Sequence, residues 1–242
     1  MTQQELKEGK TLLVDKPYDM TSFEVVKKVR YHLKKQFGFQ EKLKVGHAGT
    51  LDPKATGLLI ICIGKKTKSI HEFQGLSKTY KGILKLGVTS PSLDEETEIT
   101  SETLLVGIDN EKIREAARFL TGTYEQTPPL FSAKKVKGKR AYEHAREGKA
   151  VEMKKNIVKI HRFNIDKVSL PYVKFTVNCS KGTYIRSLAR DIGKNLNTGA
   201  ILSELRRTTI GDLKIEQAWD LDVFLSEISS ISSSPDHLLF LE

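Results

Sequence analysis

The pattern of apolar and polar positions along the chain predicts a mixture of strands and helices. The short apolar run at 11–14 predicts a strand, and the unbroken apolar run at 57–63 predicts a strand that is buried on both faces. Between them, Thr21 or Ser22 can cap a helix. The apolar residues of this helix recur at helical spacing: Phe23, Val26, Val29 and Leu33.

The rest of the chain continues this mixture without a regular alternation of strand and helix. Further strands are predicted at four places, of which the middle two should pair around Pro171: 80–88, 157–168, 172–179 and 208–215. Three helices and one short helical turn are also predicted: 110–120 with Asn110 as its cap, 141–147, 184–196 and the turn at 201–205. This order favours an α+β fold with a mixed, mainly antiparallel central sheet flanked by helices.

The composition is that of an ordinary globular protein, with 38% hydrophobic and 29% charged residues. No stretch is apolar for the roughly 18 residues that a membrane helix needs, and the polar segment 1–10 lacks the apolar part of a signal peptide. We therefore expect a cytoplasmic protein that has no membrane partner. Cys62 and Cys179 stand far apart inside apolar segments, which favours two buried thiols over a disulfide or a metal site.

The net charge of +10 is concentrated in short clusters. The densest cluster lies at 134–140, and two others lie at 65–68 and 206–207. Three such clusters could surround one polyanion, but each could equally be a solvated surface. On charge alone, both interpretations stay open.

The segment at 46–53, which reads Gly-His-Ala-Gly-Thr-Leu-Asp-Pro, is the most informative part of the sequence. Its glycines permit a tight backbone, and Pro53 restricts Asp52, so a carboxylate is held on a rigid loop between two predicted strands. The segment could also be a simple turn in which Asp52 accepts hydrogen bonds from backbone amides. A phosphate-binding loop is excluded because neither glycine-rich phosphate motif has this spacing and because Asp52 would repel the phosphate.

Other blocks accompany this segment in order along the chain. Lys-Pro at 16–17 is followed by Met-Thr-Ser at 20–22, Lys-Thr-Tyr at 78–80 and a Pro-Pro pair at 128–129. The last blocks are Gly-Thr-Tyr-Ile-Arg-Ser-Leu-Ala-Arg-Asp-Ile-Gly at 182–193 and Leu-Arg-Arg-Thr at 205–208. Together these blocks resemble the motifs of the TruB family of pseudouridine synthases, from about residue 11 to residue 215.

The resemblance implies a set of catalytic residues. It makes Asp52 the nucleophile, Tyr80 the residue that stacks on the target base and helps to move a proton, and Arg186 the partner of the catalytic carboxylate. The substrate-binding residues that it implies are His47, which helps to hold the flipped-out nucleotide, and two residues that line the base pocket, Tyr184 and Leu205. Without the resemblance, a structural role would be favoured for four of these side chains: Tyr80, Tyr184, Arg186 and His47.

The resemblance also implies the reaction, which is the isomerisation of uridine-55 to pseudouridine in the T-loop of tRNA. Neither a metal ion nor an organic cofactor is expected, and the enzyme should be a monomer that binds the T-arm stem-loop. The alternative is a relative that binds or refolds tRNA without turnover, although the presence of Asp52, Tyr80 and Arg186 favours the enzyme. Whether Asp52 attacks the base or the ribose stays open.

The domain organisation follows from the extent of the motifs. We expect a synthase domain at 1–215 with a basic RNA-binding insertion near 124–152, and a short tail at 216–242 that is not a full PUA domain. Asp19 and Ile60 depart from the family pattern, at positions that affect local turns more than Asp52. The basic residues expected to bind RNA are Lys65, Lys68, Lys134, Lys135, Lys139, Arg140 and Arg146.

Overall fold

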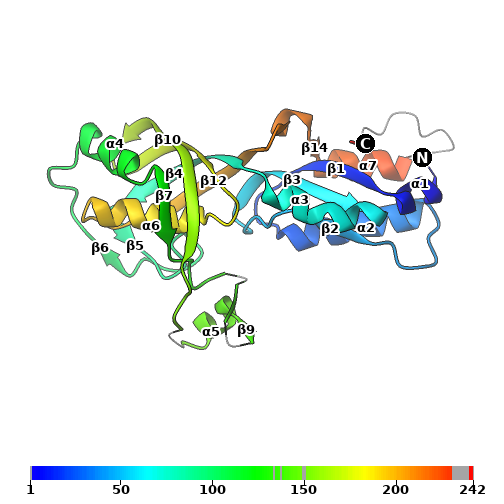
Figure 1. The fold of residues 1–242 in the computed structure, drawn as a ribbon, viewed down its shortest axis with the longest axis horizontal. Coiled ribbons are helices and arrows are strands. Elements are labelled where there is room, and N and C mark those ends of the chain that lie inside the picture. The colour runs from blue at the N-terminus through cyan, green and yellow to red at the C-terminus, as the bar shows by residue number, and fades with distance from the viewer. Residues whose placement is uncertain (1, 133, 137, 149–150, 231–239, 242) are drawn as a thin grey trace. The chain divides into compact units, whose positions relative to one another are not determined.

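The computed structural model describes all residues except 1, 133, 137, 149–150, 231–239 and 242. It divides the chain into two compact units. Unit 1 comprises Met1–Lys78 and Arg206–Glu242, and unit 2 comprises Thr79–Leu205 (Figure 1). The chain passes between the units in two strands, β4 (Lys78–Leu86) and β12 (Ala200–Ile210).

Unit 1 is built on β1 (Lys10–Lys16) and β3 (Ala55–Ile63), which pair antiparallel along their length. β3 also pairs with β2 (Val45–His47), and β1 pairs in parallel with β14 (Trp219–Asp220). The strand order in this unit is β14-β1-β3-β12, and β13 (Leu213–Lys214) pairs antiparallel with β12. Short elements complete the unit: α1 (Gln3–Glu8), η1 (Gly64–Ser69) and η2 (Ile215–Gln217).

The side chains of β1 and β3 fill two separate hydrophobic cores, because successive residues of a strand point to opposite faces. On one face, Leu59 and Ile61 pack in a cluster with α2 (Ser22–Gln36) and α7 (Leu221–Ser230). On the other face, Leu58 and Ile60 pack in a cluster that includes Ile70 of α3 (Ile70–Gly75). The predicted strand that is buried on both faces is therefore confirmed.

Helix α2 begins at a capping box in which Thr21 and Glu24 satisfy each other's backbone N–H groups. The buried face of the helix consists of Ser22, Val25, Val26, Val29 and Leu33. The prediction placed Phe23 on this face, but Phe23 is 55% exposed, because Val25 takes its place against the sheet. No helix among the described residues is long and apolar enough to cross a membrane.

Unit 2 contains the strand order β12-β4-β11-β10-β7. β10 (Asn156–Ser169) pairs antiparallel with both β11 (Tyr172–Cys179) and β7 (Gly122–Gln126). Two helices contact each other in this unit, α4 (Asn110–Phe119) and α6 (Ile185–Asn195), and α4 also packs against β10. The small elements form two hairpins and a short helix: β5 (Val88–Thr89) with β6 (Ser101–Glu102), β8 (Lys135–Val136) with β9 (Lys139–Arg140), and α5 (Ala141–Arg146).

The α+β class and the mainly antiparallel sheet are confirmed, while some local predictions were wrong. The expected helical turn at 201–205 is part of strand β12, where Ile201 and Leu202 are buried by neighbouring strands that the local sequence does not reveal. Asp109, rather than Asn110, caps α4 by accepting the Lys112 N–H at 2.9 Å. The expected division into a synthase domain and a tail stays a prediction.

The structure describes the tail at 216–242 except for residues 231–239 and 242. Phe224 of α7 is fully buried, and its ring lies 6.1 Å from that of Phe240. Leu241 donates its backbone N–H to the Thr11 carbonyl at 2.9 Å. The serines at 226, 229 and 230 belong to the end of α7, and residues 231–239 lie outside the described residues.

Candidate active site

The loop that carries Asp52 lies between two paired strands of unit 1. β2 pairs antiparallel with the end of β3, with His47 opposite Ile61, so the loop at 48–54 leaves and returns at the same strand pair. Gly49 has a φ of 103°, a backbone conformation that residues with a Cβ rarely adopt. The backbone bends at 48–49, and a hydrogen-bonded turn begins at Asp52, whose carbonyl accepts the Ala55 N–H at 3.1 Å.

Two buried side chains from distant parts of unit 1 hold this loop. The Leu51 N–H donates to the Ser22 hydroxyl at 2.8 Å, and the hydroxyl donates to the Leu51 carbonyl at 3.0 Å. The Arg207 guanidinium donates to the Gly49 carbonyl at 3.1 Å. Ser22 and Arg207 are each 1% exposed, so water does not compete for these hydrogen bonds. They fix the backbone that precedes Asp52.

Lys16 fixes the backbone that follows Asp52. Its ammonium group donates to the Pro53 carbonyl at 3.1 Å and also to the carbonyls of Pro17 and Met20. Burial lowers the pKa of Lys16 to about 8, although the negative charge of Asp52 opposes this shift. The same lysine therefore holds the loop through hydrogen bonds and attracts the Asp52 carboxylate through its charge.

His47 precedes the loop and is half-buried. Its Nδ1 atom is buried and finds no hydrogen-bond partner among the described residues. Burial and the positive charge of Arg207 lower the pKa of His47, and the Gly49 backbone opposes this only weakly. The imidazole is therefore neutral at pH 7, with one nitrogen able to donate a hydrogen bond and the other able to accept one.

Arg186 lies in the first turn of α6 in unit 2 and is 5% exposed. Its guanidinium donates to the Ser92 carbonyl at 3.0 Å and to the Phe131 carbonyl at 2.9 Å, and its Nε lies 3.5 Å from the Asp94 carboxylate. The sequence patterns did not predict this contact between Arg186 and Asp94. The pairing of Arg186 with Asp52 stays a prediction.

Gln126 positions the start of α6, which sequence reasoning also missed. The Tyr184 N–H donates to the Gln126 side-chain oxygen at 2.8 Å, and the Gln126 amide donates to the Tyr184 carbonyl at 3.2 Å. Gln126 is 1% exposed, so these two bonds are shielded from water. The only sequence signal was a glutamine immediately before the Thr-Pro-Pro block at 127–129.

Tyr80 and Leu205 lie on two strands of unit 2 that are hydrogen-bonded neighbours, β4 and β12. These strands approach closely where Gly82 faces Glu204, since a Cβ on Gly82 would lie 2.6 Å from the Glu204 carbonyl oxygen. Tyr80 is 8% exposed, whereas Leu205 is half-buried. Of the predicted site residues, unit 1 thus contributes His47 and Asp52, and unit 2 contributes Tyr80, Tyr184, Arg186 and Leu205.

The basic segment of unit 2, which is the expected insertion near 124–152, contains cations that already have protein partners. Lys134 donates to the Lys154 carbonyl and to the Asn156 side chain, both at 2.7 Å. Lys139 forms an ion pair with Glu147 at 3.1 Å. The side chains of these two lysines therefore contribute to the local structure of the segment.

The other basic residues expected to bind RNA are exposed. Lys65 of unit 1 is in an ion pair with Glu8 at 2.7 Å, while the guanidinium of Arg146 lies 5.4 Å from the centre of the Tyr142 ring. The remaining members of the set are also exposed: Lys68, Lys135 and Arg140.

Metal-binding and thiol chemistry find no site among the described residues. These residues contain no group of three or more His, Cys, Asp or Glu side chains that could hold a metal ion. Cys62 and Cys179 are thiols buried in strands, as expected, and burial raises the pKa of Cys62 to about 11. The Cys62 thiol is therefore protonated and unreactive at neutral pH.

The sequence matches two family models over most of its length. The N-terminal domain of the TruB family pseudouridylate synthases matches residues 34–185, and the C-terminal domain of tRNA pseudouridylate synthase B matches residues 186–238. The first of these models alone covers more than half of the chain. The chain belongs to the TruB family of tRNA pseudouridine synthases. The predicted family and enzyme class are therefore confirmed.

Individual relatives of the TruB family agree with this assignment. The chain is 49% identical to tRNA pseudouridine synthase B of Flavobacterium johnsoniae, over 93% of this chain and 98% of the relative. It is 50% identical to tRNA pseudouridine synthase B of Phocaeicola vulgatus, over 90% of this chain and 92% of the relative.

Among solved structures, the fold resembles a chain of a Cbf5–Nop10–Gar1 complex. The TM-score is 0.68 at 28% identity, and the match covers 92% of this chain and 55% of that chain. An H/ACA RNP bound to a substrate RNA containing 2′-deoxyuridine is similar with a TM-score of 0.66 at 24% identity, over 95% of this chain and 58% of that chain, which shows the fold alone.

Proposed function

We propose that this TruB-family enzyme converts uridine-55 in the T-loop of tRNA to pseudouridine, with Asp52 as its nucleophile. The observation that carries the proposal is the Asp52 loop, whose backbone is held by the buried side chains of Ser22, Arg207 and Lys16. A nucleophile held in this way loses little freedom when the substrate binds. The matches to tRNA pseudouridine synthase B in other bacteria support tRNA as the substrate.

The reaction breaks the bond between N1 of uracil and C1′ of ribose and forms a bond between C5 and C1′, while C5 gives up a proton and N1 gains one. No electron is gained or lost, and no group comes from another molecule. A carboxylate and groups that hold the base are therefore sufficient, and we propose that neither a metal ion nor an organic cofactor takes part.

The target nucleotide must leave its stack before a side chain can reach it. In the proposed mechanism, Tyr80 replaces the lost stacking and helps to move the C5 proton, and Tyr184 and Leu205 line the base pocket. The neutral imidazole of His47 suits an uncharged hydrogen-bond partner in the flipped nucleotide. Arg186 is assigned the pairing with the Asp52 carboxylate.

The basic insertion near 124–152 is proposed to hold the T-arm stem-loop. Exposure supports this role for Lys135, Arg140 and Arg146, while Lys134 and Lys139 also support the structure of the insertion. Lys65 and Lys68 would add contacts from unit 1. We further propose that the enzyme acts as a monomer in the cytoplasm.

Release of tritium from tRNA labelled at C5 of uridine tests the proposed function. We expect release from the unmodified transcript and none from a transcript with cytidine at position 55. Equal release from the two transcripts would show that the enzyme modifies a uridine at another position. Binding of tRNA without any release would favour the alternative, a tRNA-binding or tRNA-folding protein without turnover. Exhaustive chelation in monovalent salt should leave the rate unchanged if no metal takes part.

A further inference from the structure

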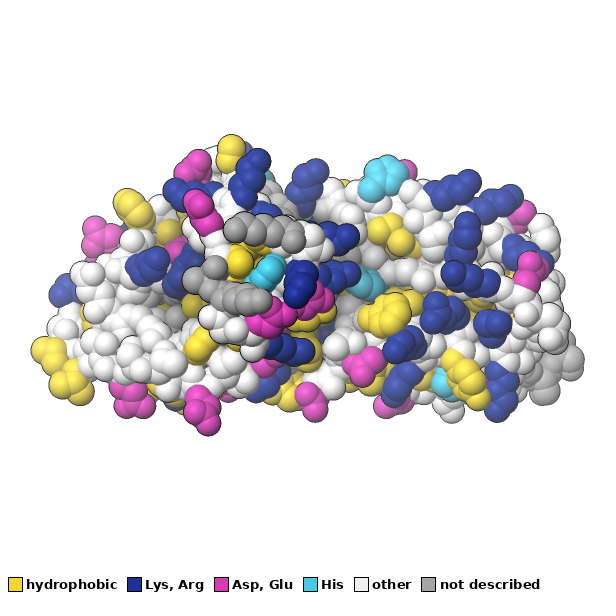
Figure 2. Space-filling model, turned by 90° about the horizontal axis from the view of Figure 1, so that it is seen from below, with side chains coloured by type: hydrophobic (Ala, Val, Ile, Leu, Met, Phe, Trp, Pro, Cys, Tyr) yellow, Lys and Arg dark blue, Asp and Glu magenta, His cyan; other side chains and the backbone are white. Residues whose placement is uncertain are grey.

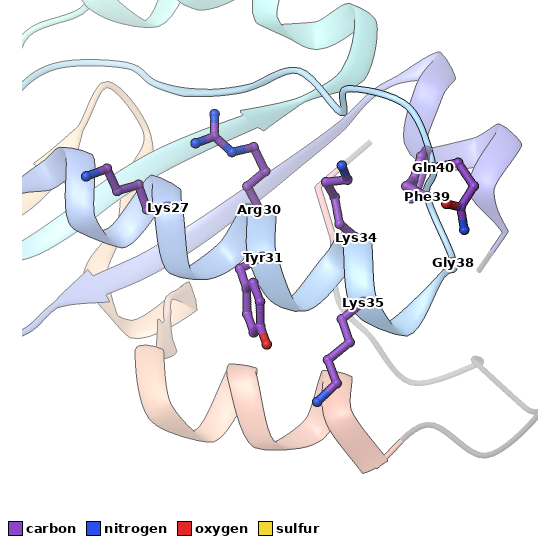
Figure 3. Close-up of a pocket in the computed structure, with 8 residues that line it drawn as sticks. All are labelled: Lys27, Arg30, Tyr31, Lys34, Lys35, Gly38, Phe39 and Gln40. Carbon is purple, nitrogen blue, oxygen red and sulfur yellow. The ribbon is translucent and has the colours of Figure 1, made fainter.

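Helix α2 presents a row of cations on its exposed side. Lys27, Arg30 and Lys34 follow one another at intervals of three and four residues, so they lie on one face of the helix, and Lys35 lies beside them. Figure 3 shows Lys27, Arg30 and Lys34 projecting from the same side of α2 in that view. These four residues are called the α2 stripe below.

The α2 stripe borders a hollow of about 560 Å³ that has no acidic residue in its lining. The lining also includes Tyr31 and the turn that follows α2, with Phe39 and Gln40 (Figure 3). On the face in Figure 2, Lys and Arg side chains gather over unit 1 with few Asp and Glu among them. The hollow is therefore a concave surface of positive charge.

The cations of the α2 stripe lie within ion-pair distance of no carboxylate among the described residues. None of the four forms an ion pair there, in contrast to Lys139 with Glu147 in unit 2. Glu24, the acid of the first turn, is occupied by the backbone and hydroxyl of Thr21. The neighbouring cations of the stripe repel each other, and an external polyanion would relieve this repulsion.

Aromatic side chains accompany the charges. Tyr31 is 61% exposed and Phe23 is 55% exposed, and the Lys27 ammonium lies 5.0 Å from the centre of the Phe23 ring. Exposed aromatic rings among cations are typical of surfaces that bind nucleic acids, because the rings stack on bases or riboses while the cations bind phosphates.

The position of α2 relates this surface to the Asp52 loop. Ser22, the first residue of α2, holds Leu51 through its hydroxyl, so the helix begins at the loop. At 1.5 Å per residue, Lys27 lies about 7 Å along the helix from Ser22, and Lys35 lies about 20 Å from it. The α2 stripe therefore leads away from the proposed nucleophile over a length that spans several phosphates.

We propose that the α2 stripe is an RNA-binding surface that holds the phosphate backbone of the substrate RNA beyond its target nucleotide. This inference rests on the proposed function, since it places the target nucleotide at Asp52. The surface would add affinity that depends on charge rather than on sequence. It would distinguish a long structured RNA from a minimal hairpin that carries the same uridine.

The test removes the four charges of the stripe together and measures RNA binding. The variant K27A/R30A/K34A/K35A is compared with K159A/R162A/K167A/K174A, which removes three lysines and one arginine from exposed positions on β10 and β11 of unit 2. The dissociation constant of fluorescent full-length tRNA and of a minimal target hairpin is measured between 50 and 200 mM salt. Thermal unfolding of each variant verifies that it is folded.

We expect the stripe variant to lose affinity for full-length tRNA by about ten- to a hundredfold, with a salt slope that is shallower by roughly two to four. The loss should be much smaller for the minimal hairpin and for the control variant. Replacing the three lysines by arginine should retain binding, because the charges remain. In turnover, the loss should fall on KM.

Unchanged affinity and salt slope in the stripe variant would overturn the inference and leave the proposed function intact. An equal loss in the control variant would also overturn it, because the effect would then reflect net charge alone. Failure of the proposed function is a separate result, recognised by the absence of tritium release in the wild-type enzyme while RNA binding still depends on the α2 stripe.

Discussion

The Asp52 loop of unit 1 and the basic segment of unit 2 use their charged residues in opposite ways. Around Asp52, the cations Lys16 and Arg207 are buried and donate hydrogen bonds to backbone carbonyls of the loop or beside it. In the basic segment, Lys135 and Arg146 are exposed to solvent. The comparison teaches that a buried cation fixes the backbone, whereas an exposed cation is available to a ligand where no neighbouring protein group engages it.

The largest effect should come from the carboxylate that the loop holds. Asp52→Asn should lower kcat at least a thousandfold, about 4 kcal/mol, because an amide cannot act as the nucleophile. Binding of tRNA should remain within about tenfold, roughly 1.4 kcal/mol, since the loop is held by other groups. Tritium release and filter binding measure the two quantities. The control is Asp222→Asn, which changes an exposed aspartate of α7. Substantial turnover by Asp52→Asn would show that Asp52 is not the nucleophile.

The next effect should come from the buried cation that holds the loop. Lys16→Met removes the hydrogen bond to Pro53 and the charge near Asp52, so kcat should fall by about ten- to a hundredfold through misplacement of the carboxylate. Lys10→Met changes a lysine at the start of the same strand and should leave kcat near the wild-type value. Single-turnover kinetics with saturating enzyme separate this effect from binding. Equal rates for Lys16→Met and wild type would show that the loop does not need this support.

A smaller effect, on the free energy of unfolding and on activity, should appear as the pH rises through the lowered pKa of Lys16. The ordinary pKa of 10.5 falls to about 8 on folding, so below pH 8 both the folded and unfolded forms are charged and the cost of burying the charge is fully present. Between pH 8 and 10.5 this cost disappears, so the contribution of Lys16 to the free energy of unfolding rises. Activity should fall over the same range, because the positive charge near Asp52 is lost.

These opposite trends distinguish Lys16 from general alkaline denaturation. The difference in unfolding free energy between wild type and Lys16→Met is measured by chemical denaturation at several pH values, beside kcat. A difference that stays constant from pH 7 to 10 would show that Lys16 is not the titrating group.

The smallest effects should come from single cations of the basic segment. Lys135→Ala or Arg146→Ala should weaken tRNA binding by a few fold and reduce the salt slope by about one for each phosphate contact that is lost. Lys134→Ala should instead weaken the segment itself, because Lys134 holds Asn156 and the Lys154 carbonyl. Limited proteolysis within the segment detects the second effect. A salt slope that stays unchanged in Lys135→Ala and Arg146→Ala would place the RNA contacts elsewhere.

The sequence by itself determined the fold class, the family and the loop that carries Asp52. The burial of both faces of β3 could be predicted from the unbroken apolar run at 57–63, because a strand covered on both sides needs no polar positions. The bend at Gly49 could be predicted from the residue type, since a positive φ is a local property of the backbone that glycine favours.

Only the tertiary structure decided which cations are buried and what they hold. Arg207 is separated from Gly49 by 158 positions, and Arg186 is separated from Ser92 by 94 positions, so no local pattern reveals either hydrogen bond. Arg206, the residue before Arg207, is partly exposed and pairs with Asp15. The two arginines differ because successive side chains of β12 point to opposite faces. Similarly, α2 has a basic exposed face because Val25, Val26 and Leu33 are drawn into the core. Burial depends on the whole chain, and burial gives each charge its role.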